Sequence, residues 1–290
     1  MEIQNVLVFD VETTGLLPRA TSIKRKFSQT SEPNPITENL DEYPYITQLS
    51  FVLYDIIQKK ILQSYNAYVR LDPHIVVPEK ITEITGITRA FLDENGKNIV
   101  DVLTEFYIAY LECDAVVAHN FEFDTRMVLT EVKRNYATLL PEIRPHILWM
   151  FNPMYCKVTY VLLHCTMKSN IERCNIKQKT AAGREFTKFP KLSELYDFLF
   201  HSVPDNLHNS MIDVLACLRC YLKTEFDIDI SDKVFDAYCK SCVGPCHVFA
   251  PAPPPKTTPY TADATSVAAL AVASTVTTSE LFIGPTLIET

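Results

Sequence analysis

The sequence predicts an α/β domain, because patterns typical of buried strands alternate along the chain with patterns typical of helices. Residues 6–9 and 115–118 are short apolar, mostly β-branched runs, as in strands covered on both faces. Apolar residues recur at helical spacing in residues 123–132 and 211–222. With 290 residues and 47% hydrophobic content, the chain has ample material for a core and exceeds a usual single domain.

The first strand ends in two carboxylates. Asp10 and Glu12 follow residues 6–9, and the period of two along a strand places both on the same side. Two ionised carboxylates on the same side of one strand repel each other. A cation or a shared proton must compensate this repulsion, and we favour a metal ion. The alternative is a pair of ordinary surface residues beyond a strand end. Thr13-Thr14-Gly15 follows as a predicted turn that offers hydroxyls and backbone amides to a ligand.

A third carboxylate, Asp124, follows the second strand. His119 and Asn120 end that strand, and Asp124 then falls in the first turns of the predicted helix. A carboxylate there is stabilised by the helix dipole even without a metal. A purely structural role is therefore the alternative to metal ligation.

The third block pairs Asp213, in the helix predicted at residues 211–222, with His208. On a continuous helix a spacing of five would rotate the two side chains by about 140°. They can converge only if His208 lies in the loop or first turn ahead of the helix. A surface or capping role is the alternative for His208, and Asn209 occupies the position four before Asp213.

Together the three blocks resemble the DnaQ-like, DEDD-type 3′-to-5′ exonuclease superfamily in its histidine subgroup. The matching segments are DVETTGL at residues 10–16, HNFEFD at 119–124, and His208-x4-Asp213. Asn209 stands where the tyrosine subgroup has tyrosine. Residues 77–87 resemble the family's helix that ends in an Ile-Thr-Gly-Ile turn, and residues 191–195 resemble its helix before the third motif. The resemblance spans roughly residues 3–225.

This resemblance implies an RNase H-like α/β fold, with a mixed central sheet flanked by helices, and a site for two divalent metal ions. The metal ligands would be Asp10, Glu12, Asp124 and Asp213, and His208 would be the general base that takes a proton from the attacking water. Oxygen-only ligands favour Mg²⁺ or Mn²⁺ over zinc. In the family, residues after the first motif contact the terminal nucleotide, which points here to Thr13, Thr14 and Leu16, with Asn120 and Phe123 lining the same region.

The expected activity is 3′-to-5′ hydrolysis of DNA phosphodiester bonds, releasing nucleoside 5′-monophosphates by a two-metal mechanism. The partner is a nucleic acid with a free 3′ end, and the protein acts alone or assists a polymerase or other replication partner. RNA is the alternative substrate, because one or two contacts that the motifs do not reveal suffice to recognise a 2′-hydroxyl. A catalytically silent nucleic-acid-binding protein on the same fold is a third interpretation.

We predict an exonuclease domain over residues 1–246 and a flexible, low-complexity tail over 247–290. The tail is rich first in proline and then in Ala, Thr, Ser and Val, and its apolar stretch is too short and interrupted to span a membrane. Two insertions relative to the family pattern are predicted within the domain, at about residues 17–45 and 152–190.

Basic residues are concentrated in one part of this acidic chain. The net charge is −8, yet residues 157–191 hold eight Lys and Arg side chains against two Glu. We predict that Lys177, Lys179 and Arg184 follow a phosphate backbone as substrate-binding residues. A solvated surface is the alternative.

Nine cysteines and the lack of an export signal predict a reducing, intracellular compartment, cytoplasmic or nuclear. Cys239, Cys242, Cys246 and His247 have the residue types and close spacing of a structural Zn²⁺ site, and Cys217 and Cys220 form a further pair. We favour buried or incidental thiols, because a CxxC pair with uneven partners is a weak signal.

Overall fold

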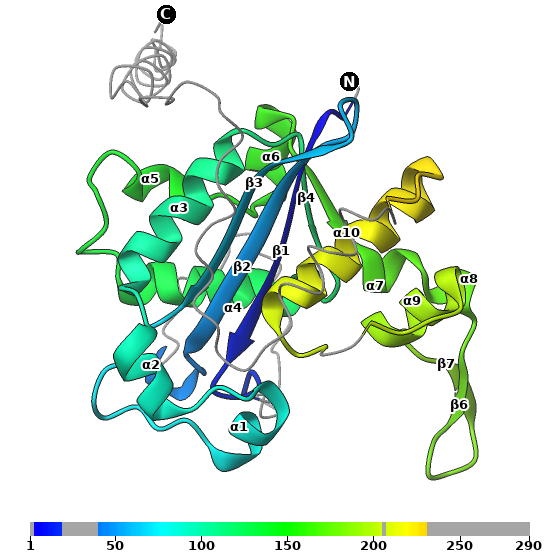
Figure 1. Ribbon diagram of the computed structural model, residues 1–290, viewed down its shortest axis with the longest axis horizontal. Coiled ribbons are helices and arrows are strands. Elements are labelled where there is room, and N and C mark those ends of the chain that lie inside the picture. Colours follow the sequence, from blue (N-terminus) through cyan, green and yellow to red (C-terminus); the bar gives the residue numbers. More distant parts are fainter. Residues whose placement is uncertain (1–2, 19–39, 205–206, 231–290) are drawn as a thin grey trace, which may run out of the picture.

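A five-stranded mixed sheet forms the centre of the protein (Figure 1), in a computed structural model that describes residues 3–18, 40–204 and 207–230. The strand order is β3-β2-β1-β4-β5. β1 is antiparallel to β2 and parallel to β4, β2 is antiparallel to β3, and β4 is parallel to β5. The strands are β1 (Asn5–Thr13), β2 (Ile46–Asp55), β3 (Lys60–Tyr68), β4 (Ala115–Ala118) and β5 (Leu162–Cys165). The predicted α/β class with a mixed sheet is confirmed.

Helices cover both faces of the sheet. The sheet thus separates two large clusters of core residues, one on each face. Leu7, Phe9 and Val11 of β1 pack with residues of α3 (Ile99–Leu111) and α4 (Phe121–Arg134). Val6 and Val8 point to the other face, where they pack under α10 (Ser210–Phe226), which crosses the sheet in Figure 1. Because side chains alternate along a strand, Asp10 and Glu12 continue the α10 side of β1.

Shorter helices complete the described chain. α1 (Glu79–Thr85) ends at Gly86, whose φ of 74° is the left-handed conformation that glycine adopts without strain. The predicted helix with its Ile-Thr-Gly-Ile turn is thereby confirmed. α9 (Leu192–Phe200) begins after Lys191 and confirms the helix predicted before the third motif. Further short helices are η1 (Leu40–Glu42), α2 (Arg89–Asn95) and α5 (Arg144–Ile147).

Residues 152–190, predicted as an insertion, contribute to the sheet as well as to the surface. Their elements are α6 (Pro153–Thr159), β5, α7 (Thr166–Ser169), α8 (Ile171–Cys174) and a two-stranded hairpin of β6 (Lys177–Lys179) and β7 (Glu185–Thr187). β5 pairs with β4 along its whole length, whereas the hairpin projects away from the sheet in Figure 1. Part of this stretch therefore belongs to the central sheet.

Three of the predicted features lie outside the described residues. These are residues 19–39 of the first insertion, the tail at 247–290, and the candidate zinc ligands Cys239, Cys242, Cys246 and His247. Cys217 and Cys220 lie within α10, and both are buried and free. Among the helices that the structure describes, none is long and apolar enough to cross a membrane.

Candidate active site

Four carboxylates from three elements meet at one end of the sheet. Asp10 and Glu12 lie at the end of β1, and Asp124 and Asp213 lie in the first turns of α4 and α10. The Asp124 carboxylate accepts a hydrogen bond from the backbone of Val11, between the two β1 acids. Asp124 is 2% exposed, and the other three are partly buried. The structure therefore brings together all four predicted metal ligands.

Burial and mutual repulsion disfavour the ionised form of this cluster. Burial raises the pKa of Asp10 to about 7. Burial, followed by the charges of Asp10, Asp213 and Asp124, raises the pKa of Glu12 to about 10. The pKa values of Asp124 and Asp213 are likewise raised by burial and then by the charge of Asp10. Each of these shifts is a cost of holding charge without a compensating cation.

No Lys or Arg side chain of the described residues forms an ion pair with these carboxylates. None of the ion pairs in residues 3–18, 40–204 and 207–230 involves any of the four carboxylates. Carboxylate oxygens that have no Lys or Arg partner are suitable ligands for hard divalent cations such as Mg²⁺ or Mn²⁺. The donor set is therefore suited to the ions that the sequence predicts.

His208 lies ahead of α10, as convergence with Asp213 requires. Its backbone N–H donates to Oδ2 of Asp213 at 3.2 Å, and its side chain is exposed. Potential ligand atoms of Glu12, His208 and Asp213 all lie within 4.8 Å of one another. His208 has a φ of 76°, a conformation that non-glycine residues rarely adopt and that often marks a functional site. Asn209 is the N-cap of the helix, and its side chain accepts from the backbone N–H of Met211.

Buried polar residues that sequence reasoning missed anchor the start of α10. Ser210 Oγ donates to the backbone carbonyl of Asp10 at 2.7 Å, and the Ser210 amide points to Oε1 of Gln48 at 3.4 Å. Gln48 is paired with Glu12 in the sheet and donates through Nε2 to Asn66. These contacts tie the helix that carries Asp213 to the strand that carries Asp10. In the sequence, the feature that could have identified this anchor is Gln48, a polar residue within the largely apolar run of β2.

His119 has a structural place beside the site. Its two ring nitrogens lie 3.0 Å from Thr166 Oγ1 and 3.1 Å from the carbonyl oxygen of Pro190. Burial lowers the pKa of His119 to about 4. The imidazole is therefore neutral near pH 7, where one nitrogen donates to Pro190 and the other accepts from the Thr166 hydroxyl. His119 thus fastens the end of β4 to the residues that precede α9.

The side chains predicted to contact the terminal nucleotide differ in how exposed they are and in whether they already form hydrogen bonds within the protein. Thr13 Oγ1 donates to the Gly15 carbonyl at 2.6 Å, and Thr14 Oγ1 accepts from the Tyr45 amide at 2.9 Å, so both hydroxyls already hold the turn. Leu16 is 84% exposed. Asn120 is exposed and makes no side-chain capping bond to α4. Phe123, in contrast, is partly buried against the core. The structure brings none of the basic predicted residues, Lys177, Lys179 and Arg184, into the carboxylate cluster.

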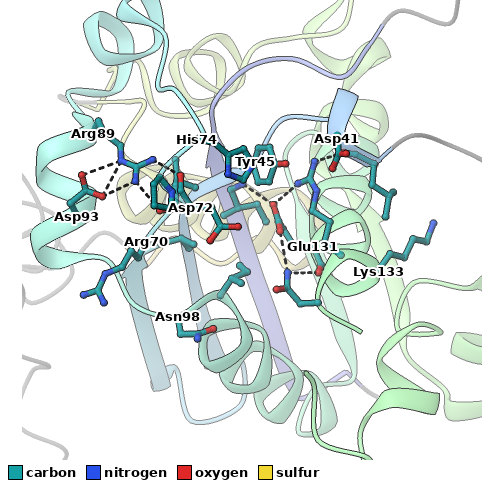
Figure 2. Close-up of a pocket in the computed structure, with 18 residues that line it drawn as sticks. Asp41, Tyr45, Arg70, Asp72, His74, Arg89, Asp93, Asn98, Glu131 and Lys133 are labelled. Atoms are coloured by element: carbon teal, nitrogen blue, oxygen red, sulfur yellow. Dashed lines mark hydrogen bonds and ion pairs between the residues drawn. The ribbon is translucent and has the colours of Figure 1, made fainter. Parts of the chain in front are cut away.

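A largely buried arginine secures the segment that precedes β2. Arg134 donates to the carbonyl oxygens of Pro44, Leu40 and Tyr43 and to Glu131, and its guanidinium lies 3.7 Å from the Tyr45 ring centroid. Arg134, Glu131, Leu40 and Tyr45 line a cavity of about 750 Å³ (Figure 2). None of the four carboxylates of the candidate active site lines it. Because Tyr45 pairs with Thr14, Arg134 indirectly supports the turn after Glu12.

Arg134→Ala is expected to reduce the free energy of unfolding by about 3–5 kcal/mol, because it leaves Glu131 as an uncompensated charge in a buried position. Urea denaturation measures this change. Arg126→Ala, on the exposed side of the same helix, is the control. Arg126 donates to the Tyr43 hydroxyl at 3.4 Å, so this change should reduce the unfolding free energy by no more than about 1 kcal/mol. Equal losses in the two variants would contradict the role given to Arg134.

The metal-free protein is expected to lose stability as the pH rises from about 4. Raised pKa values mean that the folded protein binds more protons than the unfolded chain, so this contribution is fully present below the unfolded carboxyl pKa of about 4. It is lost progressively above that pH, and the loss is complete once the pH has passed about 7 for Asp10 and about 10 for Glu12. Mg²⁺ should oppose the decline because it favours the ionised carboxylates. Thermal melts across this range in EDTA and in Mg²⁺ test this, and parallel curves would contradict it.

The sequence matches the RNase T family of exonucleases over residues 7–221. A PolC-type DNA polymerase III of Thermotoga petrophila is 31% identical over 128 residues, which are 44% of this chain and 7% of that protein. Its Thermotoga maritima counterpart is 37% identical over 75 residues, 26% of this chain and 5% of that protein. This chain therefore corresponds to a small part of the length of either polymerase.

Solved structures of exonuclease I share the fold. One is 15% identical with a TM-score of 0.52, over 81% of this chain and 43% of that one. Escherichia coli exonuclease I in complex with a dT13 oligonucleotide is 14% identical with a TM-score of 0.51, over 81% of this chain and 43% of that one. This chain thus spans less than half of their length, and at this identity the likeness concerns the fold alone. The family match covers most of the chain and includes both the sheet and the four-carboxylate cluster, so the chain belongs to the RNase T exonuclease family, within the DnaQ-like superfamily.

Proposed function

We propose that the protein is a metal-dependent 3′-to-5′ exonuclease that hydrolyses DNA and releases nucleoside 5′-monophosphates. The observation that carries the proposal is the meeting of Asp10, Glu12, Asp124 and Asp213 at one end of the sheet, with no Lys or Arg partner among the described residues. A structural role would have supplied such buried charges with hydrogen-bonded cationic partners. A site that keeps four of them uncompensated is suited to binding cations.

The four carboxylates would hold two Mg²⁺ or Mn²⁺ ions, which supply an activated nucleophile and neutralise charge on the attacked phosphate. His208 would accept a proton from the attacking water at an imidazole nitrogen. Its exposed position beside Glu12 and Asp213 leaves the ring free to approach that water. Exposed Leu16 and the Asn120 amide would position the terminal nucleotide.

The comparisons support a DNA substrate. Escherichia coli exonuclease I binds a dT13 oligonucleotide in one of the structures that share the fold, and the sequence relatives are DNA polymerases. We therefore propose a nucleic acid with a free 3′ end as the partner, and we keep a polymerase or replication partner as a proposal.

Oligonucleotides labelled at either end test the proposal. In Mg²⁺ or Mn²⁺, a 5′-labelled DNA strand should shorten stepwise, and a 3′-labelled strand should release a labelled mononucleotide from the start. A blocked 3′ terminus should resist hydrolysis, whereas a blocked 5′ terminus should not. Cleavage of a covalently closed circle would contradict the direction, and undiminished hydrolysis in EDTA would contradict the metal requirement. Faster degradation of matched RNA would reassign the protein as an exoribonuclease.

A further inference from the structure

The β6–β7 hairpin carries cationic side chains that form no ion pair within the part of the chain that the structure describes. Lys179 and Arg184 are exposed, and neither takes part in an ion pair with any residue of the described chain. Lys177 donates only to the Thr187 hydroxyl. Elsewhere in the predicted basic stretch, Lys168 is paired with Glu122 and Lys188 with Glu194. Six Lys and Arg side chains of residues 157–191 form no ion pair within the described residues. Three of them lie together on the hairpin, and Lys157, Arg173 and Lys191 lie outside it.

An exposed aromatic ring accompanies these cations. Phe186 is 42% exposed and lies opposite Gln178 in the ladder, and Lys177 and Lys179 lie opposite Thr187 and Glu185. Side chains alternate between the faces of a strand, so Phe186 and the two lysines occupy opposite faces of the hairpin. A phenylalanine that no core residue covers is available for stacking.

The base of the hairpin is fixed near the carboxylate cluster. The Lys188 amide donates to the Ile176 carbonyl and closes the base. Two residues later, the Pro190 carbonyl is bonded by His119, directly before Asn120 at the end of β4. β1 and β4 are parallel. The C-terminal end of β4 therefore lies at the same end of the sheet as the C-terminal end of β1, which carries Asp10 and Glu12. The hairpin therefore leaves the fold on the side where a substrate would enter.

We propose that this hairpin is a second nucleic-acid-binding element, which holds the single strand some nucleotides away from its 3′ end. The inference deepens the proposed function and rests on it. The strand would pass over the hairpin, so that Lys177 and Lys179 contact phosphates on one face and Phe186 stacks on a base at the other. Arg184, in the turn between the two strands, would contact a further phosphate. This combination of cations with an aromatic ring is the common means of binding single strands without sequence preference. Long strands thereby gain affinity that a trinucleotide, which fills only the carboxylate site, does not.

The test compares two charge-reversal variants in a binding assay. Lys179→Glu with Arg184→Glu removes the hairpin's unpaired charge. Lys59→Glu with Lys157→Glu is the control, because it makes the same change in net charge at exposed positions in the β2–β3 turn and on α6. Both control positions lie toward the opposite end of the sheet, near the pairs Asn5 with Asp55 and Ala115 with Leu162. Fluorescence anisotropy with a labelled single-stranded DNA of about 20 nucleotides, in EDTA, reports binding without hydrolysis.

The hairpin variant should raise the Kd about tenfold or more. The slope of the logarithm of its binding constant against the logarithm of salt concentration should become shallower by about 0.7 for each phosphate that the hairpin no longer neutralises. Phe186→Ala should weaken binding about fivefold or more with no change in salt dependence, because stacking releases no counterions. Equal weakening by the control, or an unchanged salt dependence in the hairpin variant, would overturn the inference. Failure of the wild type to hydrolyse any oligonucleotide would overturn the proposed function, and the binding comparison would still judge the hairpin.

Discussion

Asp124→Asn is expected to reduce the rate of nucleotide release by several orders of magnitude while leaving the protein folded. Asparagine keeps the shape of the side chain but removes the charge that offsets the metal ions, so losing one of the four carboxylates should disorganise both ions. The same loss is expected for the corresponding neutral variants of Asp10, Glu12 and Asp213. Single-turnover hydrolysis of an end-labelled oligonucleotide measures the change. Near wild-type turnover in any of the four would contradict the assignment of metal ligands.

The same substitution should stabilise the metal-free protein, which separates a lost function from a damaged fold. Burial and the charge of Asp10 raise the pKa of Asp124, so its ionised form destabilises the folded state, and a neutral amide should raise the melting temperature in EDTA. Asp114→Asn is the matched control. Asp114 accepts from the amides of Gln4 and Asn5 at 2.9 Å, far from the cluster along β1. That variant should lose stability and keep its activity.

His208→Asn is expected to slow hydrolysis by about 10²–10⁴-fold, the usual contribution of a general base, without preventing metal binding. Asparagine is chosen because it tolerates the positive φ of this position better than alanine. Metal binding, measured as the rise in melting temperature with Mn²⁺, should persist because the four carboxylates remain.

His201 offers a close control for this experiment. It is also an exposed histidine with a positive φ, 52°, but it lies at the end of α9. His201→Asn should hydrolyse DNA at nearly the wild-type rate. If His208→Asn were equally active, His208 would not be the base. If it lost Mn²⁺ binding, its role would instead be that of a metal ligand.

The parts of the site that sequence could predict are those governed by local periodicity. Alternation along β1 places Asp10 and Glu12 on one side, and the spacing of His208 and Asp213 requires a break in the helix that the structure places at Asn209. Apolar periodicity likewise identifies α4 and α10. In each case neighbouring residues contain the information.

Other features depend on contacts between distant segments. β5 has only four residues, and its first, Leu162, is 45% exposed, so no apolar pattern distinguishes it within residues 152–190. The anchoring of Ser210 to Asp10 and Gln48 joins positions up to 200 residues apart and follows from the way α10 crosses the sheet. The hydroxyls of Thr13 and Thr14 looked available in sequence, but the turn itself engages them.

Direct measurement of Mn²⁺ binding tests the central claim, that Asp10, Glu12, Asp124 and Asp213 form a divalent metal site. Electron paramagnetic resonance reports free Mn²⁺, so a titration with a nucleoside 5′-monophosphate present counts the bound ions without relying on activity. The wild type should bind two ions per chain, and Asp124→Asn should lose that binding while Asp114→Asn retains it. Absence of saturable binding in the wild type, or equal binding in Asp124→Asn, would contradict the claim.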